Sequence, residues 1–171
     1  RMVPGDPLDP ATRLGAIVDD VQLRTVLGYI ESGRNEGAQL LAGGRQVLQE
    51  TGGNYVEPTV FAGVRPEMKI AREEIFGPVL AAISVRDAEE AVRVGNSVIY
   101  GLAAAVWTRD VTRAHRIARA LRAGVVYVNC YDADDITTPF GGFKQSGTGR
   151  DKSLHAFDKY TELKTTWIDL S

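Results

Sequence analysis

The stretch LAAAVWTRDVTRAHRIARALRAGVVYVN, residues 102–129, decides the fold. Residues 102–108 and residues 125–129 are short, continuously apolar runs of the kind that form buried strands. Between them, apolar residues recur at helical spacing, Asp110 precedes the first turn as an N-cap, and Gly124 follows the end. The apolar face of this helix consists of Val111, Ala114, Ile117, Ala118 and Leu121. A strand, a helix and a strand with short connections predict a βαβ unit with parallel strands.

The same pattern continues toward the amino terminus. Residues 79–85 (VLAAISV) form another apolar strand, and the helix that follows opens with Asp87 and Glu90, an acidic variant of the capping box. We therefore expect an α/β fold, a parallel βαβαβ sheet with helices on both faces, because its strands are apolar on both sides. Ligands gather at the carboxyl ends of such strands, so residues 129–150 are the first place to look for a site.

Two segments before this unit carry their own signals. Residues 19–37 favour a helix that Asp19 or Asp20 caps and Gly37 ends. The apolar residues expected on its inner face are Val21, Val26, Leu27 and Ile30. Residues 54–64 (NYVEPTVFAGV) alternate around Pro58, which suggests an edge strand or an irregular strand.

The carboxyl-terminal segment differs from the rest. Residues 151–160 favour one short helix, and residues 161–170 (TELKTTWIDL) favour a long, fairly apolar strand. A strand of this kind aggregates unless it is paired. Pairing within the chain and pairing with another subunit both remain open, and a homo-oligomer is expected.

Composition narrows the class of protein. The chain has 171 residues, 44% apolar and 25% charged, as in an ordinary soluble domain. Its net charge of −2 lacks the basic excess that nucleic acid or an anionic membrane requires, so neither partner is expected. No apolar run approaches the ~20 residues of a membrane helix, and no signal peptide is recognisable. The single cysteine cannot form an internal disulfide, which favours a reducing, cytoplasmic compartment.

The stretch REEIFGPVLAAISV, residues 72–85, is the first candidate for a binding function. Two acids, Glu73 and Glu74, stand just before an aromatic residue, Phe76, and a bend. The acids are either solvated loop charges beside a core aromatic, or a carboxylate and a ring that the bend presents to a ligand. The residues alone leave both interpretations open.

Further candidates follow the third strand. Residues 139–150 (PFGGFKQSGTGR) hold four glycines but fit neither a phosphate loop nor a dinucleotide fingerprint, so this is either a tight turn or a ligand-lining loop. The acidic loop with Asp132, Asp134 and Asp135 is either a solvated turn or a site for a cationic substrate tail. Cys130 is expected to be a small core residue, and no cluster has the ligand spacing of a metal site.

Several long motifs in register resemble one family. EEIFGPV, YGLAAAVWT, GVVYVNCYD and PFGGFKQSGTGRD, in this order and at these spacings, closely resemble the carboxyl-terminal part of NAD(P)-dependent aldehyde dehydrogenases. The resemblance runs from residue 5 to the final strand and is most like the γ-glutamyl-aminobutyraldehyde and related aminoaldehyde dehydrogenases. It implies a domain over residues 1–150, followed by a helix and an oligomerisation strand over residues 151–171.

The resemblance also implies roles for individual residues. Glu74 matches the carboxylate that binds the nicotinamide-ribose hydroxyls of NAD or NADP, Phe76 matches the aromatic residue beside that ribose, and Gln22 matches a weaker cofactor contact. On the aldehyde side, Phe140 matches a wall of the substrate tunnel. Residues 132–138, with Asp132 and Asp134, match the loop at its mouth, and the final strand matches one that pairs across subunits.

In the family, the nucleophilic cysteine, the general-base glutamate and the main dinucleotide-binding domain lie before the part that this chain resembles. The chain opens at Arg1 inside a proline-rich loop and is therefore expected to be a part of a longer enzyme. This part is expected to contain no catalytic residue and to show no turnover alone. A non-catalytic module that self-assembles or binds a partner is the alternative. A small cysteine hydrolase using Cys130 and His155 is the least favoured hypothesis.

Overall fold

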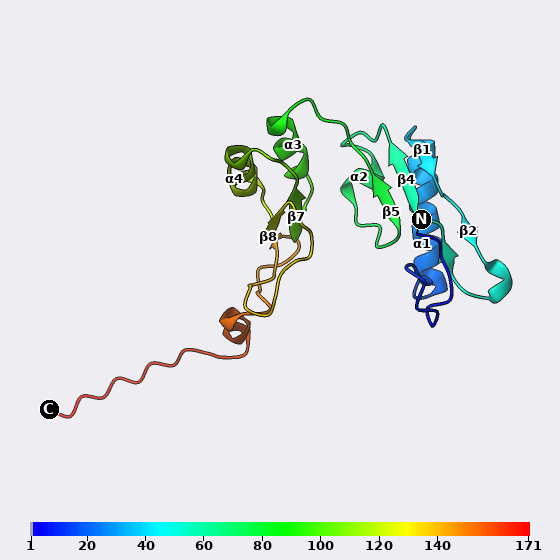
Figure 1. Ribbon diagram of the computed structural model, residues 1–171. Coiled ribbons are helices and arrows are strands. Elements are labelled where there is room, and N and C mark those ends of the chain that lie inside the picture. The colour runs from blue at the N-terminus through cyan, green and yellow to red at the C-terminus, as the bar shows by residue number, and fades with distance from the viewer. Residues whose placement is uncertain (1) are drawn as a thin grey trace. The chain divides into compact units, whose positions relative to one another are not determined.

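A computed structural model describes residues 2–171, so Arg1, the first residue of the predicted 1–150 domain, lies outside the described residues. The chain forms two compact units, one ending at Arg86 and one beginning at Asp87 (Figure 1). The helices are α1 (Asp20–Asn35), α2 (Lys69–Arg72), α3 (Ala88–Gly95) and α4 (Val111–Ala120), with two 3-10 helices, η1 (Gln49–Thr51) and η2 (Leu154–Lys159). The strands are β1 (Gln39–Ala42), β2 (Gln46–Val47), β3 (Tyr55–Val56), β4 (Thr59–Ala62), β5 (Val79–Ala81), β6 (Tyr100–Gly101), β7 (Ala103–Val106), β8 (Val125–Val128) and β9 (Phe143–Lys144).

The first unit is built on a three-stranded sheet with α1 packed against it. Strand β4 lies between β1, which runs antiparallel to it, and β5, which runs parallel (Figure 1). The segment predicted as an edge or irregular strand is thus irregular, because Pro58 separates β3 from β4, but β4 is central and the edge assignment was wrong. Pro58 lies between the two strands, so its missing N–H removes no bond from either ladder.

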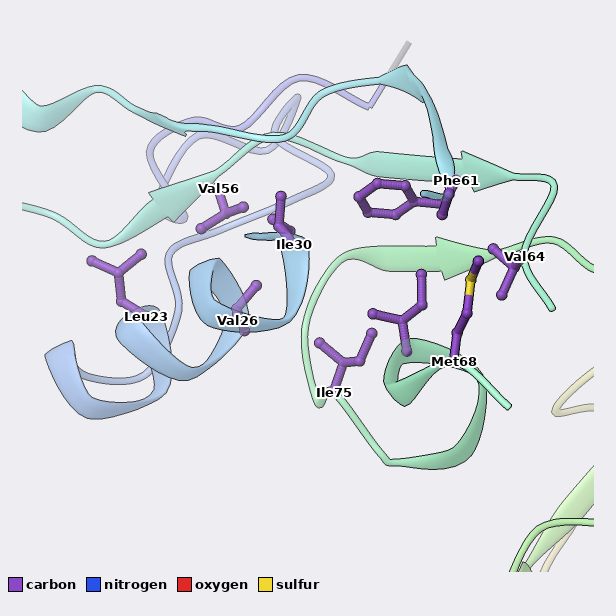
Figure 2. Packing of buried hydrophobic residues seen from close by; sticks show 10 residues of the cluster. Leu23, Val26, Ile30, Val56, Phe61, Val64, Met68 and Ile75 are labelled. Atoms are coloured by element: carbon purple, nitrogen blue, oxygen red, sulfur yellow. The ribbon is translucent and has the colours of Figure 1, made fainter. Parts of the chain in front are cut away.

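The core of the first unit lies between α1, the sheet and α2. Figure 2 shows Leu23, Val26 and Ile30 of α1 in one cluster with side chains that include Phe61 from β4. Other members of this cluster are Ala38, Val56, Val64, Met68, Ile70 and Ile75. The prediction for Val21 was wrong, since 64% of its surface is exposed. Leu23 is the first residue of the inner face, and Val26 and Ile30 follow it by three and seven residues. Val21 lies two residues before Leu23 and so points to a different side of the helix.

The ends of α1 follow the sequence prediction. The Asp19 carboxylate accepts a hydrogen bond from the backbone N–H of Gln22 at 2.8 Å, which satisfies one of the free donors of the first turn. Gly37, just past the end, has φ +88°, a left-handed conformation that costs glycine little. The aspartate cap and the terminal glycine are therefore confirmed.

The second unit contains the predicted βαβ unit. Strands β7 and β8 pair in parallel over four residues each, with α4 between them in sequence (Figure 1). Asp110 caps α4 through the backbone N–H of Arg113 at 3.0 Å, and Asp87 caps α3 through that of Glu90 at 2.8 Å. The short strands β6 and β9 pair antiparallel. The α/β class is confirmed.

The three apolar strands pair within their own units. The segment 79–85 contains the short strand β5, which pairs with β4 in the first unit, and β7 pairs with β8 in the second unit. The apolar pattern identified each of these strands.

The second unit buries few apolar side chains. Among the described residues, its buried apolar side chains are those of Ala114 and Tyr127. Val111, which was expected on the inner face of α4, is exposed, so that part of the prediction was wrong. Within the described chain, no helix is both long enough and apolar enough to cross a bilayer.

The carboxyl-terminal segment forms η2 and then an extended stretch. Residues 161–171 pair with no strand in the part of the chain that the structure describes (Figure 1). Trp167 and Leu170 are almost fully exposed. The expected strand therefore finds no partner within the described residues. Its pairing with another subunit stays a prediction.

Candidate functional site

The bend after α2 separates the roles of its two acids. The Tyr29 hydroxyl on α1 donates a hydrogen bond to Glu73 Oε2 at 2.8 Å, and the Lys69 ammonium lies 3.9 Å from the same oxygen. Glu74, by contrast, is exposed, and its side chain makes no hydrogen bond or ion pair in the described part of the chain. Glu73 thus fastens the bend to α1, and Glu74 keeps its acceptors available.

The next two residues alternate between the core and the surface. Ile75 is buried in the core cluster, whereas Phe76 is 78% exposed. The φ of Phe76 is +53°, a left-handed conformation that is unfavourable for any residue with a Cβ. Such conformations persist where the surrounding structure holds them, and they gather at functional sites. The Phe76 ring is therefore presented to solvent, as is the Glu74 carboxylate.

Helix α1 supplies the clamp that holds this conformation. The Gln22 side-chain amide donates hydrogen bonds to the carbonyls of Ile75 at 3.0 Å and Phe76 at 3.1 Å. A Cβ on Gly77 would lie 2.5 Å from Cγ2 of Val26, so a glycine is needed where the bend passes the helix.

The three residues predicted to contact the cofactor thus come together at one bend, with different surroundings. Glu74 and Phe76 face solvent, and Gln22 contacts the backbone that carries them. Their contacts with a cofactor stay predictions. Sequence reasoning missed the parts played by Val26 and Gly77 in this bend, and the glycine beside an exposed aromatic residue was the signal that could have indicated a close backbone approach.

A second cluster lies after β8. Asn129 ties the end of β8 to the end of β7, since its side chain accepts from Thr108 N at 2.8 Å and donates to Thr108 O at 2.9 Å. Asp132 is exposed, without a side-chain hydrogen bond or ion pair among the described residues. The Asp134 carboxylate, with only 5% of its side chain exposed, accepts from Lys152 Nζ at 2.6 Å and from the Tyr127 hydroxyl at 3.0 Å.

These contacts change the titration of the three groups. The hydrogen bond from Lys152, and then the one from Tyr127, holds the pKa of Asp134 below its usual value. The same bond from the other side raises the pKa of Lys152. Burial, and then the hydrogen bond to Asp134, raises the pKa of Tyr127 to about 12. At neutral pH the cluster is therefore an ion pair with a neutral phenol.

Phe140 belongs to the same cluster through Lys152. Its backbone pairs with Asp151 through bonds of 2.9 and 2.7 Å, and the Lys152 ammonium lies 5.6 Å from the centre of its ring. Of the predicted substrate contacts, Asp134 and Phe140 thus share Lys152, a residue that sequence reasoning did not select. Asp132 lies on the same loop without such a contact. The substrate roles of all three stay predictions.

The glycine-rich segment allows backbones to pass closely. A Cβ on Gly124 would lie 1.8 Å from the carbonyl oxygen of Gly141, so only glycine fits. The Arg150 guanidinium donates to the carbonyls of Gly142 at 3.0 Å and Gly149 at 2.9 Å, and Lys144 donates to the end of α3 at Asn96 O. These contacts support the tight-turn interpretation of the segment.

Cys130 has no activating partner in the described chain. It is exposed, so the expected core position was wrong, and no hydrogen bond joins its thiol to His115 or His155 among the described residues. His155 instead contacts the Asp158 carboxylate at 3.2 Å. Within these residues no group of three or more side chains could hold a metal ion. A cysteine hydrolase built on Cys130 therefore has no support.

Comparison with known proteins identifies the family of this chain. The Aldehyde dehydrogenase family model matches residues 1–166, so the chain belongs to the aldehyde dehydrogenase family. It is 51% identical over 167 residues to the NADP/NAD-dependent aldehyde dehydrogenase PuuC of Escherichia coli (strain K12). That alignment covers 98% of this chain and 33% of PuuC.

Two solved structures show the same relationship. An indole-3-acetaldehyde dehydrogenase in complex with NAD+ is 65% identical, with a TM-score of 0.96, and the match covers 99% of this chain and 34% of that one. The γ-glutamyl-γ-aminobutyraldehyde dehydrogenase of Burkholderia cenocepacia J2315 is 63% identical, with a TM-score of 0.93, over 96% of this chain and 33% of that one. The chain thus spans about a third of the length of the relatives it matches. The resemblance to aminoaldehyde dehydrogenases is confirmed.

Proposed function

We propose that this chain is the part of an aldehyde dehydrogenase that contacts the nicotinamide ribose and borders the aldehyde, and that the complete protein oxidises an amino-substituted aldehyde to its acid with NAD or NADP. The observation that carries the proposal is the bend at residues 73–77. There an exposed carboxylate without a partner among the described residues stands beside an exposed ring, in a backbone that α1 holds.

The residues of the bend fit the group that they would hold. An ionised carboxylate only accepts hydrogen bonds, so Glu74 can accept one hydrogen bond from each of two neighbouring ribose hydroxyls. The exposed Phe76 ring offers an apolar face beside the sugar. When bound, the nicotinamide ring would supply the hydride acceptor, and the role of this chain would be to orient that ring.

On the aldehyde side, Phe140 would line the substrate tunnel and the loop 132–138 would lie at its mouth. Asp132 is exposed and makes no side-chain hydrogen bond or ion pair among the described residues. Its negative charge therefore favours a substrate with a cationic tail. The name of one relative supports this choice, since it is an aminoacetaldehyde dehydrogenase of Pseudomonas aeruginosa, and aminoacetaldehyde carries a cationic amine. Asp134 was also predicted to contact substrate, but its engagement with Lys152 favours another role.

The isolated chain is proposed to be inactive. Thioester chemistry on an aldehyde needs an activated thiolate, and the thiol of this chain, Cys130, has no activating partner among the described residues. The nucleophile and general base would lie elsewhere in the complete protein. The exposed apolar residues of the carboxyl-terminal segment support pairing of residues 161–170 with another subunit. A purely self-assembling module remains the second candidate, supported by the same segment.

Substitution of Glu74 in the complete protein tests the proposal. Glu74→Gln keeps the shape but removes the charge, and we expect nucleotide affinity to fall at least about tenfold, because hydrogen bonds to charged acceptors are the stronger ones. The measurement is a fluorescence titration with NAD+ and NADP+. Glu50→Gln, at an exposed acid in η1, is the matched control and leaves both dissociation constants unchanged. Equal affinities for Glu74→Gln and the unsubstituted protein would overturn the cofactor role.

A further inference from the structure

The second unit contains a nearly buried carboxylate that has no part in the proposed cofactor contact. Asp134 has 5% of its side chain exposed, while Asp132 and Asp135 on the same loop are exposed. A buried charge is costly unless it is paired and hydrogen-bonded, and here both carboxylate oxygens accept a bond. The loop therefore holds one acid inward by specific contacts.

The partners of Asp134 come from separate segments. Tyr127 lies on β8, and Lys152 follows the glycine-rich segment. The hydrogen bond from Tyr127 to Asp134 spans seven residues, and that from Lys152 spans eighteen. Asp134 thus joins a strand end to a distant stretch of chain, which local turn formation cannot explain.

The stretch around Lys152 also holds Phe140. The backbone of Asp151 pairs with that of Phe140, and Ser153 N donates to the carbonyl of Ile136 at 2.6 Å. The Lys152 ammonium faces the Phe140 ring at 5.6 Å while it donates to Asp134. The same few residues therefore fasten the acidic loop on one side and Phe140 on the other.

The backbone at this point is in an unfavourable conformation. Lys152 has φ +56° and Ser153 has φ +53°, two consecutive residues with a Cβ in the left-handed region. Such conformations persist only where surrounding contacts hold them. The ion pair, the ring contact and the two backbone pairings are the contacts that do so here.

We propose that Asp134 and Lys152 are positioning residues: with Tyr127, their ion pair holds the loop 132–138 against Phe140 and so shapes the wall that meets the aldehyde. Asp132 is left as the acid that faces the substrate. This inference rests on the proposed function and refines it. Asp134 positions the loop, whereas Asp132 contacts the substrate. It also reassigns Asp134, for which a substrate contact was predicted.

The test uses Lys152→Met in the complete protein, because methionine keeps much of the side-chain length and removes the ammonium. The Asp134 carboxylate is then buried without its cation, and the loop must move to solvate it. We expect the amides of residues 132–138 to exchange with solvent at least about tenfold faster, in the absence of cofactor and aldehyde. The KM for the aldehyde rises about tenfold, while the KM for the nucleotide stays within about twofold.

Three further variants separate positioning from stability. Lys152→Arg keeps the charge and stays close to the unsubstituted protein. Glu67→Gln breaks an exposed ion pair with Arg65 in the first unit, 2.8 Å long, and changes neither exchange nor KM. The double variant Asp134→Asn with Lys152→Met leaves no unpaired buried charge, so it folds stably but keeps the raised KM for the aldehyde. It carries the test if Lys152→Met alone does not fold.

The proposal is overturned if the exchange of residues 132–138 is unchanged in both Lys152→Met and the double variant. It is also overturned if the KM values for aldehyde and nucleotide rise equally, because a wall of the aldehyde site has no reason to alter the nucleotide. Absence of aldehyde oxidation by the complete protein would instead overturn the proposed function. The exchange experiment uses no aldehyde, so it still decides whether Lys152 holds the loop.

Discussion

The bend at residues 73–77 holds the proposed cofactor contacts of the first unit, and the loop at residues 132–138 holds proposed substrate contacts of the second. The two segments are held in different ways. The bend is anchored by Ile75 in an apolar core and by neutral hydrogen bonds from Gln22. The loop is held by an ion pair whose carboxylate is nearly buried, in a unit whose buried apolar side chains, among the described residues, are those of Ala114 and Tyr127. The conformation of Ile75 and Phe76 therefore depends mainly on packing, and that of the loop depends on charge.

Because of this difference, the bend and the loop should respond to different changes in solvent and in sequence. Packing tolerates changes of pH and salt but responds to the loss or gain of a single methyl group. A buried ion pair tolerates changes of nearby volume but responds to the loss of either partner.

Removal of a core side chain should affect the first unit most. Phe61 is fully buried at the centre of the cluster, so Phe61→Ala is expected to lower the free energy of unfolding of the first unit by about 3–5 kcal/mol. In the second unit, Leu121→Ala is the matched change at a half-buried position, and its cost should be clearly smaller. Urea denaturation followed by amide exchange measures both. Equal costs would show that the second unit is as tightly packed as the first.

Addition of a methyl group should loosen the bend. A Cβ on Gly77 would lie 2.5 Å from Val26, so Gly77→Ala is expected to cost about 1–3 kcal/mol and to weaken nucleotide binding by the complete protein. Gly28→Ala is the control, because open space surrounds that helical glycine. It should stabilise by about 0.5–1 kcal/mol. Thermal denaturation and a nucleotide titration check both, and a tolerated Gly77→Ala would contradict the clamp.

A change of pH should have the smallest effect near neutrality and separate the two regions only at the extremes. The lowered pKa of Asp134 means that its stabilising contribution is present above the unfolded value of about 3.9 and is lost as pH falls through the folded value. The pKa of Lys152 is raised, and that of Tyr127 is raised to about 12. The stabilising contributions of these two groups are therefore present below about pH 10 and are lost as the pH rises. The other titratable groups near this cluster are Asp132, Asp135 and Tyr131.

Amide exchange of residues 132–138, corrected for its intrinsic pH dependence, should therefore be constant between about pH 5 and pH 9 and rise outside that window. The amides of residues 75–77 should show a smaller rise at high pH, because the Gln22 hydrogen bonds that hold this part of the bend join neutral groups. A loop that loosens between pH 6 and pH 8 would contradict the assignment of the ion pair.

Local chemistry made much of this fold predictable. Asp19, Asp87 and Asp110 each cap a helix as expected, because a short carboxylate before an apolar periodic segment meets the free N–H groups of the first turn. The strand–helix–strand pattern of β7, α4 and β8 was likewise readable, since short connections leave parallel pairing as the simple solution. The family resemblance located Glu74 and Phe76, which composition alone left undecided.

Contacts between distant residues were not predictable in the same way. Nothing local assigns β5 to β4, joins Gln22 to the carbonyl of Phe76, or pairs Lys152 with Asp134. The same limit explains the error at Val21, because helical periodicity leaves the orientation of an apolar stripe uncertain until the opposing surface is known. Functional positions that depend on such contacts become visible only in three dimensions.

A structure of the complete protein with a bound nicotinamide nucleotide would show whether the bend at residues 73–77 contacts the nucleotide. We predict that both Glu74 carboxylate oxygens lie about 2.5–3.0 Å from the ribose hydroxyls beside the nicotinamide, with the Phe76 ring against the same sugar. A nucleotide whose nicotinamide ribose contacts neither residue, while the bend keeps the conformation described above, would contradict it.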